Sequence, residues 1–215
     1  MREFPTRLAV LAATLTPALA RAVEPAPEPP PNNVEYFQYG VALVGETALS
    51  AGDVCPATPE ATPCILGSGG GLALRVGYRA RDPWYLGGAY EFSRQDSSNL
   101  LRLAILQQLR LEARYFFDRG MRTTPFVVGS VGGMLYGREW SASTAGGVLS
   151  AGAGLEYQVS ATTVIGFAPM YRLLVPHAWT DSTGTRRADA FLGFGFAHFF
   201  AVEFILEVRD PLPRW

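Results

Sequence analysis

The chain has 215 residues, of which 48% are hydrophobic and only 17% are charged, and its 18 basic residues are all arginine. An ordinary soluble domain carries about 25% charged residues, and the net charge of −1 excludes the basic surface of a nucleic-acid-binding protein. No stretch approaches the ~20 consecutive apolar residues that a membrane-spanning helix needs. With 23 glycines and 12% aromatic residues, the composition favours an all-β protein that is either soluble or a membrane barrel.

Residues 1–20 have the layout of a secretory signal peptide. Two arginines precede a short apolar stretch, which ends in the small residues Ala18 and Ala20 of a cleavage site. Cleavage after Ala22 is a second option. The chain is therefore expected to be exported.

The proline-rich segment 21–33 is expected to be an extended linker, because such a composition cannot build a core. We expect a single folded domain over residues 34–208, followed by a C-terminal tail over 209–215.

Eight segments of this domain alternate between apolar and other side chains, as strands do when each face meets a different environment. They cover residues 34–48, 70–80, 84–95, 100–117, 124–140, 146–160, 163–180 and 188–207. In 100–117, eight of the nine odd positions are apolar, whereas Arg110 and Arg114 occupy even positions. The phase of 124–140 is ambiguous because of its glycines. Residues 100–114 are also rich in good helix formers, but the two-residue period favours a strand there.

The longest connection, residues 49–69, holds both cysteines of the chain, Cys55 and Cys64. A pair this close in an exported loop predicts a disulfide. No catalytic, cofactor-binding or metal-binding motif stands out elsewhere in the chain. The glycine-rich run 67–71 lacks the lysine and the following helix of a phosphate-binding loop.

The two faces of the segments distinguish a soluble barrel from a membrane barrel. A soluble barrel turns its apolar face inward, whereas a membrane barrel turns it toward lipid. Here the apolar face is long, aromatic and repeated, and it exceeds what a narrow eight-stranded interior can hold. The opposite face carries charges together with small residues such as Gly152, Gly154, Gly166 and Ala168. The apolar face is therefore expected to point outward into lipid, with a soluble, exported lipocalin-like barrel as the alternative.

On its alternation, its glycine usage and its aromatic last segment, Phe191 to Phe204, the chain resembles the small eight-stranded bacterial outer-membrane barrels of the opacity type and the OmpA-like porin fold. The resemblance covers roughly residues 34–208. It implies an all-β, eight-stranded, antiparallel up-and-down transmembrane barrel in the bacterial outer membrane, in contact with lipid and inserted by the barrel-insertion machinery. Members often end on an aromatic residue, and Trp215 fits this pattern, although Pro211 and Pro213 precede it.

In such a barrel the fourth and eighth strands face each other across the lumen. We expect arginines of the fourth strand to project toward Gly193, Gly195 and Ala197 of the eighth, and buried charges to pair because an unpaired one costs several kcal/mol. The expected lumen charge network consists of Arg75, Glu91, Arg102, Arg110, Glu112, Arg114, Glu156, Arg172 and Glu203. A closed structural plug is favoured, with a narrow gated pore as the alternative.

The role expected from the sequence is therefore non-enzymatic, either structural or in surface interaction. The loop 49–69 is the candidate site for an extracellular ligand. Some eight-stranded barrels are lipid A deacylases with a serine two residues after a histidine, but here Trp179 follows His177 at that spacing. The histidine is expected to be interfacial, beside a tryptophan of the aromatic belt.

Overall fold

The computed structural model describes residues 34–55, 64–98, 101–117, 121–139, 141–181, 184–187 and 192–212. The expected signal peptide and linker lie outside the described residues, as do segment 56–63 of the first loop and Trp215. Within the described residues, no helix has the length and apolar character required to cross a bilayer.

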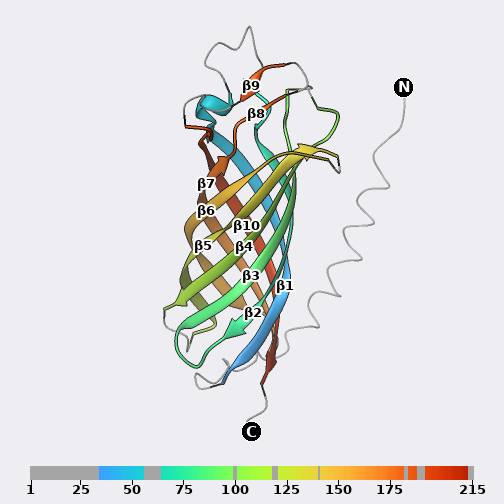
Figure 1. The fold of residues 1–215 in the computed structure, drawn as a ribbon. Helices are drawn as coiled ribbons and strands as arrows, with labels where there is room; N and C mark the ends of the chain where they lie inside the picture. The colour runs from blue at the N-terminus through green and yellow to red at the C-terminus, as the bar shows by residue number, and fades with distance from the viewer. Residues whose placement is uncertain are drawn as a thin grey trace, which may run out of the picture.

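Eight long antiparallel strands close into a barrel (Figure 1). They are β1 (Tyr36–Ser50), β2 (Gly69–Arg79), β3 (Trp84–Gln95), β4 (Ala104–Phe116), β5 (Thr123–Arg138), β6 (Ser141–Gln158), β7 (Thr163–Pro176) and β10 (Ala197–Pro211). Each strand pairs with its neighbours in sequence order, and β10 pairs with β1 to close the ring. The expected fold class is confirmed.

The two ends of the barrel differ. Short turns join the strands at the end where β10 finishes, whereas the other end holds the longer connections after β1, β3 and β7, together with the tight connection between β5 and β6 (Figure 1). The latter include the 3-10 turn Gly52–Val54 and the small pair β8 (Trp179–Thr180) and β9 (Arg186–Arg187). In outer-membrane barrels the short turns are periplasmic and the longer loops extracellular, so we call these the turn end and the loop end.

The side chains of every strand obey the predicted inversion. In β4, Leu109 and Leu111 are 66% and 72% exposed on the outside, whereas Arg110 between them is 1% exposed in the lumen. The outer wall carries large apolar side chains on all eight strands, among them Leu43, Leu74, Leu86, Val131, Leu149, Phe167 and Phe204. A soluble barrel would expose this surface to water, which soluble monomers avoid on such a scale.

Several bounds and phases differ from those expected. Residues 104–116 form a strand, so the helical alternative is wrong. The last strand begins at Ala197 rather than near residue 188, and it continues to Pro211, where it still pairs with Tyr36. Leu101 precedes β4 and packs partly buried against the inner apolar cluster of the loop end, not on the outer wall.

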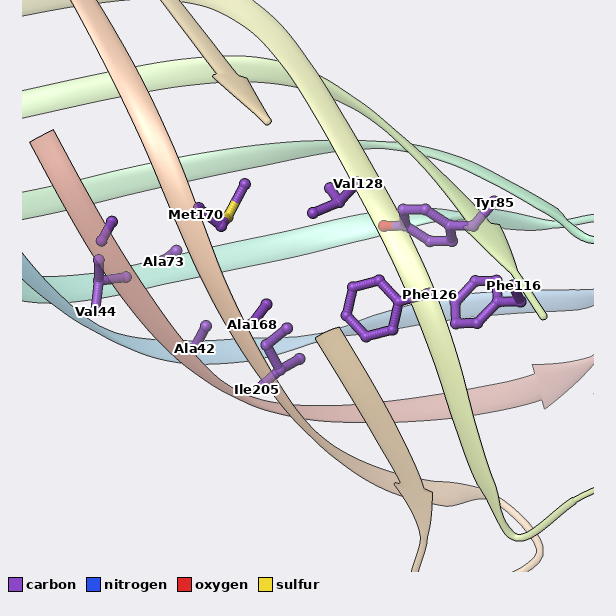
Figure 2. Close-up of a cluster of buried hydrophobic side chains, with 11 residues drawn as sticks. Ala42, Val44, Ala73, Tyr85, Phe116, Phe126, Val128, Ala168, Met170 and Ile205 are labelled. Atoms are coloured by element: carbon purple, nitrogen blue, oxygen red, sulfur yellow. The ribbon is translucent and has the colours of Figure 1, made fainter. Parts of the chain in front are cut away.

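Aromatic rings and small residues fill the lumen toward its turn end. Tyr85, Phe116 and Phe126 point into the space enclosed by the strands, together with Met170 and several alanines (Figure 2). A Cβ added at Gly87 would lie 2.3 Å from the Tyr85 hydroxyl oxygen, and one at Gly154 would lie 2.5 Å from the Phe126 ring. Small inward residues are therefore required by the large side chains opposite them, as the sequence predicts for a crowded lumen.

Candidate functional site

The centre of the lumen holds a continuous network of buried ion pairs between six of the eight barrel strands, β1, β2, β3, β4, β7 and β10. Its members are Arg75, Arg110, Arg114 and Arg172 with Glu46, Glu91, Glu112, Glu203 and Glu207. Each of these side chains faces inward because it occupies the inward phase of its strand, where alternate residues share one face. All nine are at most 4% exposed.

Arg172 of β7 occupies the loop-side half of this network. Its Nη1 lies 2.7 Å from Oε1 of Glu91 and also pairs with Glu46, and its Nη2 lies 2.5 Å from Oε1 of Glu203. Arg110 connects the same carboxylates, 2.9 Å from Oε2 of Glu91 and 3.2 Å from Oε1 of Glu203. Two guanidinium groups thus bind β1, β3 and β10 together through shared carboxylates.

Arg75 and Arg114 extend the network toward the turn end. Arg75 pairs with Glu203 and lies 3.1 Å from Oε1 of Glu112. Arg114 donates to both oxygens of Glu207, at 2.9 and 2.8 Å, and its Nε lies 2.5 Å from Glu112. This bidentate geometry is the strongest form of an arginine–carboxylate pair.

Buried amides and a hydroxyl donate further hydrogen bonds to three of the carboxylates. Glu46 accepts from Nε2 of Gln95 at 2.6 Å and from the Ser93 hydroxyl at 3.3 Å. Gln108 donates to Glu91 at 3.2 Å, and Gln38 donates to Glu207. These neutral donors matter because a carboxylate has more acceptor sites than one guanidinium fills.

A second, smaller cluster lies near the turn end. Glu156 pairs with Arg209 and lies 2.8 Å from Nη1 of Arg79. The guanidinium of Arg79 stacks 3.8 Å from the centroid of the Phe116 ring, and that of Arg114 lies 4.6 Å from the Tyr85 ring centroid. Cationic and aromatic side chains therefore pack together inside the barrel at this end.

The lumen is electrically balanced. Its nine-membered network has four arginines and five glutamates, and the cluster at Glu156 has two arginines and one glutamate. The described strands thus place six positive and six negative charges inside. Such an interior attracts neither cations nor anions as a class.

Eight of the nine residues predicted for the network lie inside the barrel, and the ninth does not. Arg102 lies before the start of β4 and is exposed. Its sequence position is even, like those of the inward arginines of β4, but this parity does not predict the direction of a side chain outside the strand. The expected contact between the arginines and Gly193 or Gly195 is also wrong, because both glycines precede β10 and the arginines meet Glu203 and Glu207 instead.

Other members of the lumen were missed from the sequence. Glu46, Glu207, Arg79, Arg209 and the three glutamines share the inward phase with predicted members. Glu207 follows Glu203 on the same face of β10, and Arg79 follows Arg75 on the same face of β2. The alternation itself was the signal that could have found them.

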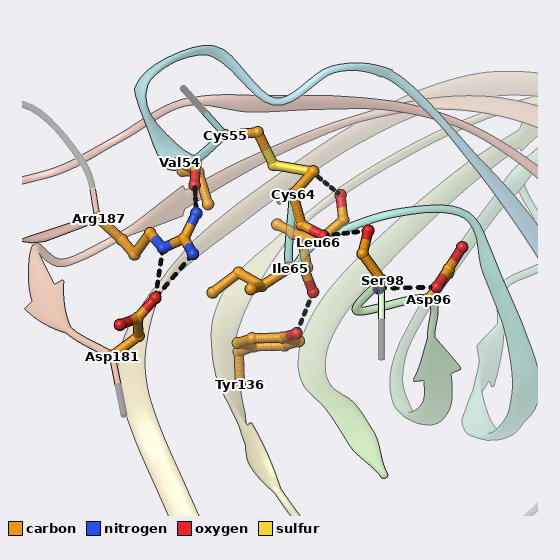
Figure 3. The surroundings of a disulfide bond; sticks show 10 residues. All are labelled: Val54, Cys55, Cys64, Ile65, Leu66, Asp96, Ser98, Tyr136, Asp181 and Arg187. Carbon is orange, nitrogen blue, oxygen red and sulfur yellow. Dashed lines mark hydrogen bonds and ion pairs between the residues drawn. A yellow bond between two sulfur atoms is a disulfide. The ribbon is translucent and has the colours of Figure 1, made fainter. Parts of the chain in front are cut away.

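The first loop folds into the mouth of the barrel at the loop end (Figure 3). Ile65 and Leu66 are 3% and 1% exposed and pack with Leu106, Tyr136 and Phe199 of the barrel wall. The Tyr136 hydroxyl donates to the carbonyl of Ile65. These residues form an apolar layer between the charged network and the loop end.

Both arms of this loop are anchored close to its cysteines. The predicted disulfide joins Cys55 to Cys64, with their Cα atoms 4.6 Å apart. The Ser98 hydroxyl donates to the Cys64 carbonyl at 2.8 Å, and Arg187 donates to the Val54 carbonyl at 3.4 Å while pairing with Asp181 (Figure 3). The disulfide thus lies at the edge of the apolar layer.

The two histidines lie outside the charged lumen. His198 shares a hydrogen bond with the Tyr171 hydroxyl on the lipid-facing wall. His177 is exposed beyond β7, and its backbone bridges to Phe194. No group of side chains suited to hold a metal ion occurs in the described residues.

Solved structures share this architecture. The outer membrane protein OprG of Pseudomonas aeruginosa superposes with a TM-score of 0.53 at 16% identity, over 85% of this chain and 99% of OprG. The outer membrane protein AlkL, solved by solid-state NMR in lipid bilayers, gives a TM-score of 0.50 at 10% identity, over 100% of this chain and 99% of AlkL. Neisserial surface protein A gives 0.45 at 17% identity, over 81% and 96%. No protein-family model and no curated protein sequence matches the chain.

The resemblance inferred from the sequence is confirmed at the level of the fold, and the outer wall supplies the independent physical argument. A closed barrel leaves no unpaired strand edge, which is the condition for β-structure in lipid. The chain therefore has the fold of the small eight-stranded outer-membrane barrels, and its outward apolar surface places it in the bacterial outer membrane.

Proposed function

We propose that this protein is a non-conducting outer-membrane barrel whose lumen is a structural plug and whose activity lies at its outer surface. The observation that carries the proposal is the pairing of all six lumen arginines with six glutamates. An eight-stranded barrel is just wide enough for side chains to fill. Here those side chains are cross-linked by ion pairs and covered by an apolar layer at the mouth.

Conductance in planar bilayers tests the plug. We expect the refolded full-length protein to give no stable single-channel steps. Steady steps from the wild type would contradict the proposal and favour the narrow gated pore. The gel-mobility shift on boiling verifies on the same samples that the barrel is folded. An absence of conductance steps can then be attributed to the plug rather than to failed insertion.

The proposal includes the absence of enzymatic activity. It is supported by His198, which hydrogen-bonds to Tyr171 on the lipid-facing wall, and by Trp179 at the position where a deacylase of this fold has its serine. Mass spectra of lipid A from cells with and without the protein are expected to be identical. Loss of an acyl chain on expression would contradict the assignment.

A role in surface interaction is proposed for the loop 49–69. It is supported by the anchoring of both arms, because a loop tied by a disulfide loses less conformational entropy on binding than a free one. Replacing residues 56–63 with a glycine–serine linker leaves the anchored arms intact. We expect cells that carry this variant to lose adhesion that the wild-type protein confers, and equal adhesion would refute the role.

Insertion by the barrel-assembly machinery is also proposed, on the basis of the fold. Depletion of that machinery is expected to reduce the heat-modifiable form of this protein. An unchanged amount of this form would contradict the requirement.

A further inference from the structure

The lipid-facing wall is almost free of charge, and one of its exceptions is an arginine near the loop end. In the eight described barrel strands, the exposed charged residues are Arg94, Arg138 and Asp210, and of these Arg138 pairs with the buried Ala104 rather than lying on the outer wall. Asp210 lies at the turn end, on β10 opposite Phe37. Arg94 is exposed on β3, two positions beyond Phe92 and opposite Ile105 of β4. Its guanidinium is therefore placed where the apolar wall ends.

A second arginine lies at the same corner of the barrel. Arg102 is exposed two residues before β4, which begins at Ala104 opposite Gln95. Arg94 and Arg102 together line two adjoining hollows. One, of about 300 Å³, is also lined by Ser68 and Ser97, and the other, of about 510 Å³, by Phe92, Leu103 and Ile105. Two guanidinium groups thus lie between a polar hollow and an apolar one.

Neither arginine is neutralised within the described part of the chain. Two carboxylates line the hollows, Asp96 and Glu139, and neither forms an ion pair with Arg94 or Arg102. Asp96 accepts the backbone N–H of Ser98 at 2.9 Å instead. The contrast with the lumen is direct, because every arginine there has a glutamate partner.

We propose that Arg94 and Arg102 bind the phosphate of a phosphorylated glycolipid of the outer leaflet, whose acyl chains lie against Phe92 and the exposed Leu109 below it. A guanidinium presents paired donors that match phosphate oxygens. On β3 the apolar Phe92 lies on the turn side of Arg94, as the acyl chains lie below the phosphate in such a lipid. No bond is made or broken, and the assignment does not depend on whether the lumen conducts.

The opposite wall provides an internal comparison. A larger hollow of about 640 Å³ lies across β1, β6, β7 and β10 and is lined by Leu43, Leu155, Phe167, Phe204 and other residues, none of them charged. That hollow suits acyl chains alone. Recognition of a phosphate is therefore assigned to the corner formed by β3 and β4.

The test measures lipid retention by the refolded full-length protein in detergent, using native mass spectrometry. The probes are lipid A carrying its phosphates, the same lipid A after dephosphorylation, and inorganic phosphate as a competitor. The test variant is Arg94→Gln with Arg102→Gln, and the matched control is Arg138→Gln. Arg138 is an exposed arginine of the same end that lines a different hollow, beside Tyr136 and Trp179. The gel-mobility shift verifies folding of all three proteins.

We expect the wild type and the Arg138 variant to retain phosphorylated lipid A about a hundredfold more strongly than the double variant, since each of the two lost charge-assisted hydrogen bonds weakens binding about tenfold. Dephosphorylated lipid A should bind all three proteins equally. Equal retention of phosphorylated lipid A by wild type and double variant would overturn the proposal. Displacement of the lipid by equimolar inorganic phosphate would also overturn it, because the site would then recognise a free anion.

Discussion

Removal of one guanidinium from the lumen should be among the most damaging single changes in this protein, and Arg172→Met is the sharpest case. Arg172 is fully buried and contacts Glu46, Glu91 and Glu203. Methionine fills similar space without charge. Breaking a buried ion pair by removing one partner costs about 3–5 kcal/mol, because the remaining charge stays buried without compensation.

The three carboxylates are not affected equally. Glu91 keeps Arg110, and Glu203 keeps Arg110 and Arg75. Glu46 keeps only neutral donors, Gln95, Gln108 and Ser93. Most of the cost should therefore arise at Glu46, and adding Glu46→Gln to Arg172→Met should recover a large part of it.

Reversible urea unfolding in phospholipid vesicles, followed by tryptophan fluorescence, measures these free energies. The wild type, both single variants and the double variant form a thermodynamic cycle. We expect Arg172→Met to be destabilised by about 3–5 kcal/mol and the double variant to be more stable than Arg172→Met alone. A loss below about 1 kcal/mol, the range of solvent-exposed pairs, would show that water screens the lumen and would refute the argument. So would a double variant that is no more stable than Arg172→Met.

Three further predictions concern other parts of the barrel. Replacing Cys55 and Cys64 with serine should lower the free energy of unfolding by about 2.5–3 kcal/mol, because the ten-residue ring closed by the disulfide is lost. The same urea titration measures this change. The control is the wild type treated with a reducing agent, which should lose the same free energy. Gly132→Ala should be destabilised by about 1–3 kcal/mol, because the added Cβ would lie 2.0 Å from the Leu109 carbonyl oxygen. At the neighbouring Gly133 an added Cβ meets nothing closer than 3.8 Å, so Gly133→Ala should be tolerated. Equal yields of heat-modifiable protein from the two variants would contradict this prediction. Leu111→Arg on the lipid face near the middle of β4 should cost about 2–4 kcal/mol, and Leu49→Arg near the loop end of β1 about 0–1 kcal/mol; equal costs in vesicle unfolding would argue against the assigned membrane depth.

Alternation along the chain was sufficient to predict which face meets lipid for the strands other than β5, whose phase its glycines left ambiguous. Leu109, Arg110 and Leu111 were assigned to opposite sides from parity alone, and the structure confirms each assignment. Parity works because a strand turns successive side chains to opposite faces, and because hydrocarbon and a charged lumen select opposite residue types. The eight strands and their order follow from the same pattern.

The errors lie where the backbone leaves the strand. Arg102 and Leu101 have the parity of their neighbours in β4, but β4 begins at Ala104. Gly193 and Gly195 likewise precede β10. Beyond a strand end, the direction of a side chain depends on the loop conformation, which has no period in the sequence.

The apolar layer at the mouth could not be predicted for the same reason. Ile65 and Leu66 form no periodic pattern, and only tertiary structure places them against Leu106 and Phe199. The disulfide was predictable because it depends on the compartment and on the spacing of Cys55 and Cys64 rather than on the path of the loop. Chemistry that is local in sequence was therefore accessible, and packing between distant segments was not.

The arginines of this chain show how position on a strand decides the role of a single residue type. In the buried lumen, where water is excluded, each of the six arginines has a glutamate partner, and the charges of these pairs sum to zero. At the turn end, Arg81 pairs with Glu35 at 2.8 Å although its side chain is 59% exposed, where such a pair contributes little. At the corner formed by β3 and β4, Arg94 and Arg102 have no carboxylate partner among the described residues. Burial makes a carboxylate partner necessary for the lumen arginines, whereas solvent makes such a partner unimportant for the exposed Arg81. Arg94 and Arg102 lie at the boundary between hydrocarbon and water. There an unpaired guanidinium is available to bind an anionic group of a membrane lipid.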